Sequence, residues 1–510
     1  HKVDSCNTDL HKLFYTPDKI VVPYAPILVE STRSVGYSFE AAVADIIDNS
    51  ISAGAREVNI TFDSTTSPFF CIADDGCGMT ADELENAMRY GSQSSLETRG
   101  KNDMGRFGLG MKMASMSQCR KMTVITKKSG IISAASWDLD HIIQENNWAL
   151  KRFSEKEIKG MPGYDYLKDH DTGTVVVWQE FDYLRTECSD SRRDFGTAFL
   201  EKVKAAREHV ALVFHRFIRG NEPGIKKIKI FFNNDEVEGI DPFLENHPAT
   251  QRLADYPIPV GNEQILVKPF ILPIISKLRK KDIDALGGKE SIRQRQGFYV
   301  YRNKRLIIWG TWFRIISQSE VGKLARIRVD IPNTLDTLWG IDVKKSKANI
   351  PHMIRDKLRN VIEDAMGKSE KVIKYRGRNP KKDDGLIHTW DVFDDRGKIR
   401  YQINRNMPSL KALMNHLGED EADALENMLK MVEEEFPYHD VYYRMAKEKM
   451  IDDKDKDNEK ELYNRALSMV HDMESCGEDI PTFIEAMRHM ERFAKHPEVI
   501  NKIAEVYGDD

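Results

Sequence analysis

The sequence predicts an α+β protein in which two mixed α/β parts are followed by a mainly helical part. Over the first 190 residues, segments with apolar residues at helical spacing alternate with short strand-like segments. A second group of strand-like segments lies between residues 226 and 331, and the pattern after residue 369 is mostly helical. Because 510 residues are too many for one hydrophobic core, we expect domains at 1–195, 196–368 and 369–510.

The composition is that of an ordinary folded chain, with 41% hydrophobic and 31% charged residues. No run of eighteen apolar residues is present, so we expect no membrane span, and the first ten residues lack the apolar region of a secretory signal. The six cysteines lie far apart without a C-x-x-C pair. This spacing argues against a zinc site or a disulfide scaffold and predicts a reducing, cytoplasmic location.

The net charge of −5 is unevenly distributed. Residues 383–510 contain 31 acidic and 17 basic side chains, whereas residues 1–382 contain 50 acidic and 59 basic ones. A basic body with an acidic tail is compatible with a polyanionic partner for the body. An uneven solvated surface is an equally good interpretation of the same numbers.

The elements of the first part follow from local signals. Val43, Ile46 and Ile47 have helical spacing, and Thr80 with Glu83 forms a capping box, which marks a helix start. The expected elements, in chain order, are a helix at 39–51, strands at 57–62 and 69–73, a helix after Thr80, a polar loop at 91–102, a glycine turn and helix at 105–118, and strands at 122–126 and 174–178.

The second part is expected to begin with a long amphipathic helix at 194–218. Strands at 226–232, 265–270, 297–301 and 325–331 and a helix at 350–366 are expected to follow it. A basic connector at 368–384 then leads to the helices of the C-terminal region.

Three polar or glycine-bearing motifs in the first part carry possible chemistry. In the first, Asp45 and Asn49 are four residues apart on the expected helix, so both project from one face. A carboxylate can orient a water molecule, and an amide oxygen is a hard ligand for a divalent cation. Alternatively, the two residues form part of a solvated helix surface.

The second motif is D-x-G-x-G at the end of an apolar strand, with Asp74, Gly76 and Gly78 followed by Met79. A carboxylate at a strand end can accept a hydrogen bond from the amino group of a base, and glycines let the backbone approach a flat ligand. A simple β-turn would give the same pattern.

The third motif places Gly105, Gly108 and Gly110 before an expected helix, with Lys112 in its first turn. Free backbone N–H groups at a helix start can bind phosphate. Because Met111 stands where a Walker A loop requires lysine, and because the spacing is not G-x-G-x-x-G, neither of those motifs is present.

Taken in order, these motifs resemble the GHKL ATPase superfamily, which includes gyrase B subunits, histidine kinases, MutL and the heat-shock chaperone ATPases. The stretches DIIDNSISAGA, DDGCGMTADEL and GRFGLGMKMASMSQC look like the MutL and MORC branch. The resemblance covers about residues 30–365. It implies a Bergerat-type α/β sandwich with a mobile lid over ATP, followed by an α/β transducer domain.

The resemblance also implies a role for each motif residue. Asn49 matches the magnesium-binding asparagine and Asp74 the aspartate that recognises adenine. The further positions expected to contact the nucleotide are the glycines and methionine beside Asp74 (Gly76, Gly78 and Met79), the lid-hinge and phosphate glycines (Gly105, Gly108 and Gly110), Lys112, and Thr174 near the adenine.

Asp45 stands where the family usually has the glutamate that activates water. Aspartate is one methylene shorter, which implies slow hydrolysis or nucleotide gating alone. If Asp45 is not the base, Asp48 is the next candidate.

The second part also resembles the family. GFYVYRNKRLI (297–307) looks like a segment of the MutL and MORC transducer domains, and WGIDVKKSKANIP (339–351) looks like the loop that brings a lysine to the γ-phosphate. We choose Lys345 as that lysine and retain Lys344 and Lys347 as rivals, since the spacing does not decide between them.

Basic residues gather at 277–305, with Phe298, Tyr299 and Tyr301 between them, and again at 344–384. These stretches are candidates for contact with a DNA backbone. Alternatively, they keep a transducer surface solvated, and the three aromatic residues belong to a strand core.

The resemblance predicts an ATPase that uses ATP and Mg²⁺ and forms an ATP-dependent homodimeric clamp. The family implies DNA repair, chromosome maintenance or antiviral defence against foreign DNA. Separately, we expect partner proteins to dock on the C-terminal region. A chaperone-like ATPase acting on proteins is the alternative. A histidine kinase fits least, because only about thirty residues precede the expected ATP domain.

Overall fold

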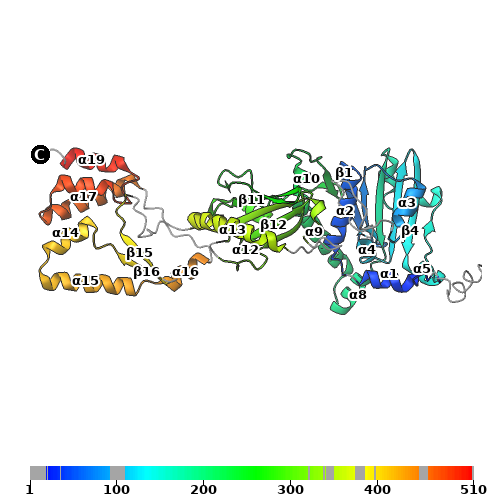
Figure 1. Cartoon of the computed structure of the whole chain (residues 1–510), viewed down its shortest axis with the longest axis horizontal. Helices are drawn as coiled ribbons and strands as arrows, with labels where there is room; N and C mark the ends of the chain where they lie inside the picture. The colour runs from blue at the N-terminus through cyan, green and yellow to red at the C-terminus, as the bar shows by residue number, and fades with distance from the viewer. Residues whose placement is uncertain are drawn as a thin grey trace, which may run out of the picture. The chain divides into compact units, whose positions relative to one another are not determined.

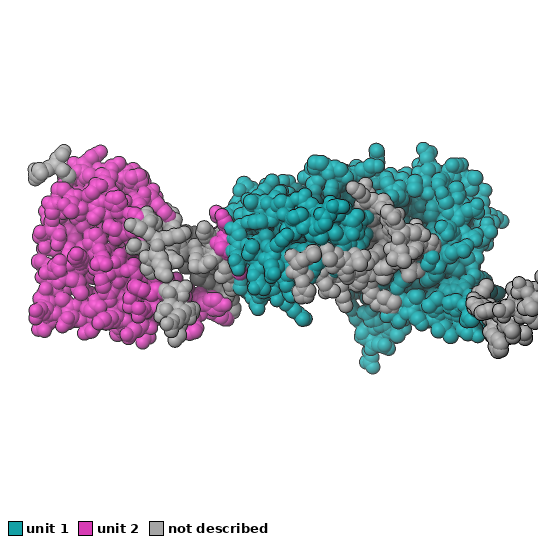
Figure 2. All heavy atoms as spheres, in the orientation of Figure 1, with its two compact units in different colours: residues 1–272, 281–365 teal, residues 273–280, 366–510 magenta. Residues whose placement is uncertain are grey.

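The structure is a computed structural model that describes residues 19, 21–34, 36–91, 110–319, 322–336, 339, 350–373, 385–395, 398–446 and 458–507. These residues form two compact units, which Figure 2 colours teal and magenta. The first unit contains residues 1–272 and 281–365, and the second contains 273–280 and 366–510. The division into three domains at 195 and 368 stays a prediction.

The first unit contains an eight-stranded sheet in the order β5-β4-β3-β6-β2-β1-β7-β8 (Figure 1). Neighbouring strands are antiparallel except β1 and β7, which are parallel. The strands are β1 (Glu57–Asp63), β2 (Phe69–Asp74), β3 (Lys121–Lys128), β4 (Ile131–Asp138), β5 (Lys151–Arg152), β6 (Gly173–Gln179), β7 (Lys229–Phe232) and β8 (Asp235–Glu236). This sheet therefore includes two strands from beyond residue 195.

Alternating residues of β2 face two different cores. Phe70 and Ile72 join the larger core, whereas Cys71 and Ala73 join a smaller one on the other side. The larger core includes residues of α1 (Ala25–Arg33), α2 (Phe39–Ser52), α3 (Ala81–Met88), α4 (Gly110–Met116), α5 (Leu139–Glu145), α8 (Asp182–Ser191), α9 (Phe195–Val213) and α10 (His215–Arg219). The smaller core includes residues of α6 (Glu155–Ile158) and α7 (Tyr164–Lys168). The result is an α/β sandwich with both sheet faces covered.

A second sheet of the first unit has the order β10-β11-β14-β12-β13, and β9 also pairs with β11. Its strands are β9 (Gln251–Arg252), β10 (Tyr256–Val260), β11 (Glu263–Ile271), β12 (Gly297–Arg302), β13 (Arg305–Thr311) and β14 (Ala325–Ile331). Helices α11 (Lys280–Ala285), α12 (Lys289–Gln294) and α13 (His352–Ile373) and the short η2 (Asn333–Leu335) occur in the same stretch of chain. Every residue of β12 is buried, as the apolar sequence of that strand requires.

The second unit consists of helices and one β-hairpin. The short η1 (Ile275–Lys277) also belongs to it. Its other elements are β15 (Trp390–Asp395), β16 (Lys398–Ile403), α14 (Pro408–His416), α15 (Glu419–Glu434), α16 (Tyr438–Ala446), α17 (Glu459–Ser475), α18 (Ile480–Arg488) and α19 (Pro497–Tyr507). Apolar residues of α17, α18 and α19 form its core.

The mixed α/β architecture predicted from the sequence is confirmed, followed by a mainly helical region. The C-terminal region differs from the expectation in one respect, since it includes the β15–β16 hairpin. The helix expected at 194–218 is divided into α9 and α10 at Phe214. Among the described residues, no helix is both long enough and apolar enough to cross a membrane.

Candidate functional site

Helix α2 carries the first motif. Ser38 caps its start by accepting a hydrogen bond from the Ala41 amide at 3.3 Å, and Gly54 follows its end with a φ of +76°. Asp45 and Asp48 are buried, whereas Asn49 is exposed. The same helix therefore offers an accessible amide next to two carboxylates that are withdrawn from water.

Asp45 lies at the junction of α2 and α4. The Tyr37 hydroxyl donates a hydrogen bond to Asp45 Oδ2 at 3.0 Å. A side chain added at Gly110 would lie 3.7 Å from the same oxygen, so the first residue of α4 passes close to this carboxylate. This places one of the predicted phosphate glycines beside the predicted base.

Asp74, at the end of β2, is held by two donors. The Ser50 hydroxyl donates to Oδ2 at 2.7 Å and the Gly76 amide to Oδ1 at 2.9 Å. Burial raises the pKa of Asp74 to about 6, although both hydrogen bonds act in the opposite direction. Since each carboxylate oxygen has two lone pairs, Asp74 can still accept a hydrogen bond from a ligand.

Three neighbouring strands place Asp74, Thr174 and Thr126 in one row. Asp74 of β2 pairs with Thr174 of β6, which pairs with Thr126 of β3. The two threonine hydroxyls are 3.3 Å apart, and Thr126 Oγ1 also accepts a hydrogen bond from the Met79 amide at 2.8 Å. The fold thus brings together the predicted residues Asp74, Met79 and Thr174.

The glycines of the second motif are required by the protein backbone itself. Gly78 has a φ of +63°, and a Cβ there would lie 2.0 Å from the Lys127 carbonyl oxygen. A Cβ at Gly76 would lie 2.8 Å from the Ala53 side chain. These glycines let the loop after β2 pack against β3 and the end of α2, a reason additional to close approach of a ligand.

Lys112 of α4 has a protein partner that its position in the sequence did not suggest. It is buried, and its Nζ donates to the Ala87 carbonyl at 2.8 Å, in the last turn of α3. Burial lowers the pKa of Lys112 to about 8. In this structure Lys112 joins α4 to α3, and its contact with phosphate stays a prediction.

Several predicted site residues lie outside the described residues. They are Gly105 and Gly108, most of the loop at 91–102, Lys345 and its rivals Lys344 and Lys347. Among the described residues, no group of three or more His, Cys, Asp or Glu side chains could hold a metal ion.

Part of the basic stretch at 277–305 is not available for DNA. Arg302 is buried and makes two hydrogen bonds with Asp336, at 2.6 and 2.7 Å. Arg305 is buried against α2. The aromatic residues of this stretch, Phe298, Tyr299 and Tyr301, are buried in the second sheet. The alternative interpretation, in which they belong to a strand core, is therefore confirmed.

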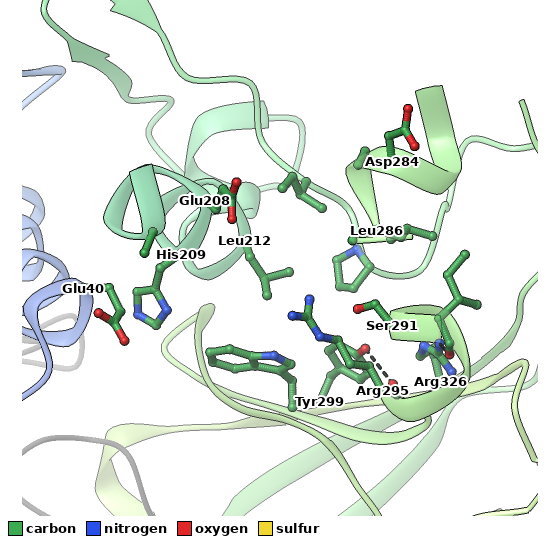
Figure 3. A pocket seen from close by; sticks show the side chains of 17 residues that line it. Glu40, Glu208, His209, Leu212, Asp284, Leu286, Ser291, Arg295, Tyr299 and Arg326 are labelled. Carbon is green, nitrogen blue, oxygen red and sulfur yellow. Dashed lines mark hydrogen bonds between the residues drawn. The ribbon is translucent and has the colours of Figure 1, made fainter. Parts of the chain in front are cut away.

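A cavity of about 370 Å³ lies between α9 and the second sheet (Figure 3). His209 and Glu40 lie at one end of it, and Arg295, Tyr299 and Arg326 line the side formed by the second sheet and α12. None of the predicted nucleotide residues lines this cavity. It is therefore separate from the candidate nucleotide site.

Four residues that support the candidate site were missed in the sequence. Tyr37 and Arg305 contact the carboxylates of α2, Ser50 fixes Asp74, and Thr126 links Met79 with Thr174. Ser50 could have been noticed because it follows Asn49 directly. Nothing local marks Arg305 or Thr126, since their partners are distant in sequence. Tyr37 lies eight residues before Asp45, but no motif singles it out.

Comparison with known proteins identifies the first part. Residues 37–174 match the family described as histidine kinase-, DNA gyrase B-, and HSP90-like ATPase. The chain therefore contains a GHKL-type segment at residues 37–174. The match begins at Tyr37 and ends at Thr174, so it includes α2, Asp74 and the start of α4.

The matches to curated relatives are short, and this chain covers far less than two thirds of the length of each relative. The chain is 34% identical over 95 residues to the ATPase morc-1 of Caenorhabditis elegans, which is 18% of this chain and 11% of that protein. It is 32% identical over 89 residues to the DNA mismatch repair protein MutL of Halobacterium salinarum, 17% of this chain and 14% of the relative. It is 32% identical over 106 residues to mouse MORC family CW-type zinc finger protein 3, 20% of this chain and 11% of that relative.

A solved N-terminal domain of a DNA repair protein covers 68% of this chain and 97% of its own length. The TM-score is 0.40 and the identity 16%, so this likeness adds nothing to the functional argument.

Proposed function

We propose that this protein binds and slowly hydrolyses ATP with magnesium. The observation that carries the proposal is the arrangement around Asp74, a buried carboxylate that is fixed between the Ser50 hydroxyl and the Gly76 amide within the segment that matches the GHKL family. Thr174 and Met79 stand beside it. This row of groups suits the polar edge of an adenine base.

In the proposed site, each remaining group has one task. Asp74 accepts a hydrogen bond from the adenine amino group, and Asn49 supplies an amide oxygen to magnesium. Magnesium bound to the phosphates would neutralise their charge. Asp45 takes a proton from the attacking water, whose oxygen bonds to the terminal phosphorus while ADP leaves. Gly105, Gly108, Gly110, Lys112 and Lys345 are proposed to contact the phosphates.

We infer that ATP binding promotes dimerisation of this chain. Three large apolar side chains of the N-terminal region are exposed: Val21 is 79%, Tyr24 70% and Ile27 66% accessible. Exposing apolar surface to water is unfavourable in a monomer. A second copy that covers them is the simplest occupant of this surface. The γ-phosphate would favour the closed dimer by binding it more tightly than the open form.

DNA is the proposed target of the clamp, in repair, chromosome maintenance or defence against foreign DNA. The support is the net positive charge of residues 1–382 and the names of relatives with similar GHKL segments. A chaperone-like ATPase is the alternative. Salt-dependent retardation of DNA would favour the first, and restored folding of a client protein without any effect on DNA would favour the second.

Partner proteins are proposed to dock on the second unit. Its helix α15 exposes Met428 and Met431, and α16 exposes Tyr442 and Tyr443. Methionine side chains adapt to varied surfaces, and tyrosine is common at interfaces.

The proposal is tested by calorimetric titration with a non-hydrolysable ATP analogue. The variant Asp74→Asn should lose roughly 2–4 kcal/mol of binding free energy, because an amide can present a donor to the adenine amino group. Asn49→Ala is the companion variant, in which the contribution of magnesium to affinity should disappear. Unchanged affinity in Asp74→Asn would remove the basis of the proposed nucleotide site.

A further inference from the structure

Arg305 connects the second sheet to Asp45 and Asp48 of helix α2. It is the first residue of β13, and only 5% of it is exposed. Its Nε lies 3.1 and 3.2 Å from the two carboxylate oxygens of Asp48. A second nitrogen, Nη2, lies 3.7 Å from Asp45 Oδ1. One side chain thus faces both Asp45 and Asp48 of α2.

The two contacts differ in kind. The Arg305–Asp48 contact has hydrogen-bond length, whereas the Arg305–Asp45 contact is an ion pair beyond that length. Asp45 and Asp48 are both almost fully buried, so each would raise the energy of the other if no cation stood beside them. The Arg305 guanidinium therefore places a positive charge beside both Asp45 and Asp48.

The surroundings give Asp45 further polar neighbours. The Tyr37 hydroxyl donates to its other oxygen, and His209 of α9 is close enough to Arg305 for the arginine to lower its pKa, although burial is the larger cause. The pKa of His209 is about 4, so this histidine is neutral near pH 7. The other charged groups nearby have partners of their own. Glu40 of α2 faces His209. Lys112 of α4 donates a hydrogen bond to the Ala87 carbonyl, and Asp74 of β2 accepts one from Ser50.

We propose that Arg305 is a positioning residue for ATP hydrolysis, which ties the second sheet to the base. By binding Asp48, Arg305 fixes the position of α2 relative to β13. By its charge, it keeps Asp45 ionised and oriented toward the phosphate end of the proposed site. This inference rests on the proposed ATPase function and extends it. A displacement of the second sheet would move the guanidinium away from Asp45 and slow the proton transfer, without changing the adenine end.

The geometry supports this separation of roles. Asp74 and its partners Ser50 and Gly76 belong to the GHKL domain, and the described contacts of that row involve no residue of the second sheet. The cavity of about 370 Å³ also lies between α9 and the second sheet, lined by His209 and Trp309. The interface is therefore incompletely packed near Arg305, which lowers the cost of a shift.

The test compares Arg305→Gln with wild type in two assays, analogue binding and ATP turnover from pH 5 to 9. We expect analogue affinity within about threefold of wild type, and turnover about 10–100-fold lower. The acidic limb of the turnover profile should move to higher pH by about 1–3 units, because a carboxylate that loses its cation holds a proton more tightly. Arg305→Lys should restore part of the turnover and reverse part of the shift.

Arg302→Gln is the matched control, since Arg302 is an equally buried arginine of the second sheet paired with Asp336 rather than with α2. It should leave the pH profile in place even if it destabilises the fold. If Arg305→Gln does not fold, Arg305→Lys carries the test, because it keeps the charge but loses the planar fork. Its turnover should be below wild type while analogue affinity stays within about threefold, and wild-type turnover would overturn the role of Arg305.

Two outcomes separate this inference from the proposed function. A wild-type chain that neither binds nor hydrolyses ATP would overturn both. Normal wild-type turnover, together with an unchanged rate and pH profile in Arg305→Gln, would overturn only the role of Arg305.

Discussion

Asp74 is the residue with the clearest chemical assignment in the candidate site, and burial gives it a pH-dependent test. Its pKa is raised to about 6, so the carboxyl of the free protein takes up a proton as the pH falls below that value. Adenosine has no phosphate that titrates nearby. If ionised Asp74 accepts from the adenine amino group, adenosine affinity should be constant above pH 7 and about tenfold lower at pH 5.

Calorimetry with adenosine between pH 5 and 8 measures this dependence. Asp74→Asn should bind weakly at every pH and show no slope in this range. The same affinity at pH 5 and pH 7 in the wild-type protein would mean that the ionised carboxyl does not recognise the base.

Asp45 is the second residue with a sharp test. Asp45→Asn should still bind ATP but hydrolyse it about 10²–10⁴-fold more slowly, since an amide cannot take a proton. Tyr37 can still donate a hydrogen bond to the amide oxygen, so the helix should keep its position. Turnover is measured by phosphate release, with analogue binding as the control.

Asp45→Glu distinguishes two explanations of the shorter side chain. A rise in turnover would mean that the native aspartate is a deliberately weak base in a protein that uses ATP as a timer. A fall would mean that Tyr37, Gly110 and Arg305 form a pocket fitted to aspartate. A wild-type rate in Asp45→Asn would instead direct attention to Asp48.

At the scale of elements, Lys112 joins the end of α3 to the start of α4. These helices flank the segment 92–109 in the sequence, which contains most of the expected lid. Lys112 is buried and donates to the Ala87 carbonyl, and its pKa is lowered from 10.5 to about 8. This hydrogen bond fixes the end of α3 relative to the start of α4, the two helices that flank the expected lid in the sequence.

The burial of Lys112 predicts a pH-dependent stability. Between about pH 8 and 10.5 the unfolded chain holds a proton on Lys112 that the folded protein has lost, so stability rises with pH in this window. The stability of wild type relative to Lys112→Met should therefore increase by up to about 2 kcal/mol between pH 8 and 9.5.

Thermal unfolding of the two proteins at both pH values measures the difference. Lys128→Met is the control, because Lys128 is a half-buried lysine of β3 that pairs with Glu83 at the surface. A constant difference between wild type and Lys112→Met would show that Lys112 stays protonated in the folded protein.

At the scale of the whole molecule, the prediction concerns the dimer. Light scattering should show a doubled mass when the ATP analogue and magnesium are added. Ile27→Ser should weaken this dimer by about tenfold or more, since it removes apolar area from the proposed contact. ATP affinity of the isolated subunit should not change, because Ile27 lies on α1 and outside the candidate nucleotide site.

Ile131→Ser is the matched control. Ile131 is 68% exposed and Ile27 66%, but Ile131 begins β4, in a different element. The same mass with and without the analogue would contradict the clamp. Equal weakening by both substitutions would place the dimer contact elsewhere.

The sequence by itself determined the mixed architecture and supplied the candidate nucleotide residues, because both depend on local signals. The period of the apolar residues in α2, the capping box at Thr80 and the glycines after β2 act within a few residues of each other. For the same reason, Asp74, Met79 and Thr174 could be named in advance, since each belongs to a short motif. Their roles toward ATP are still predictions.

The tertiary structure decided which partner each charged side chain has. The sequence predicts that Lys112 contacts phosphate, and the approach of α3 to α4 gives Lys112 the Ala87 carbonyl as a partner in this structure. Arg305 looked like part of a DNA-binding stretch, yet the packing of β13 against α2 buries it beside Asp48, 257 residues away. The sequence gives only the sign of each residue's charge. The burial of that residue and its distance from a partner depend on elements that meet only when the chain has folded.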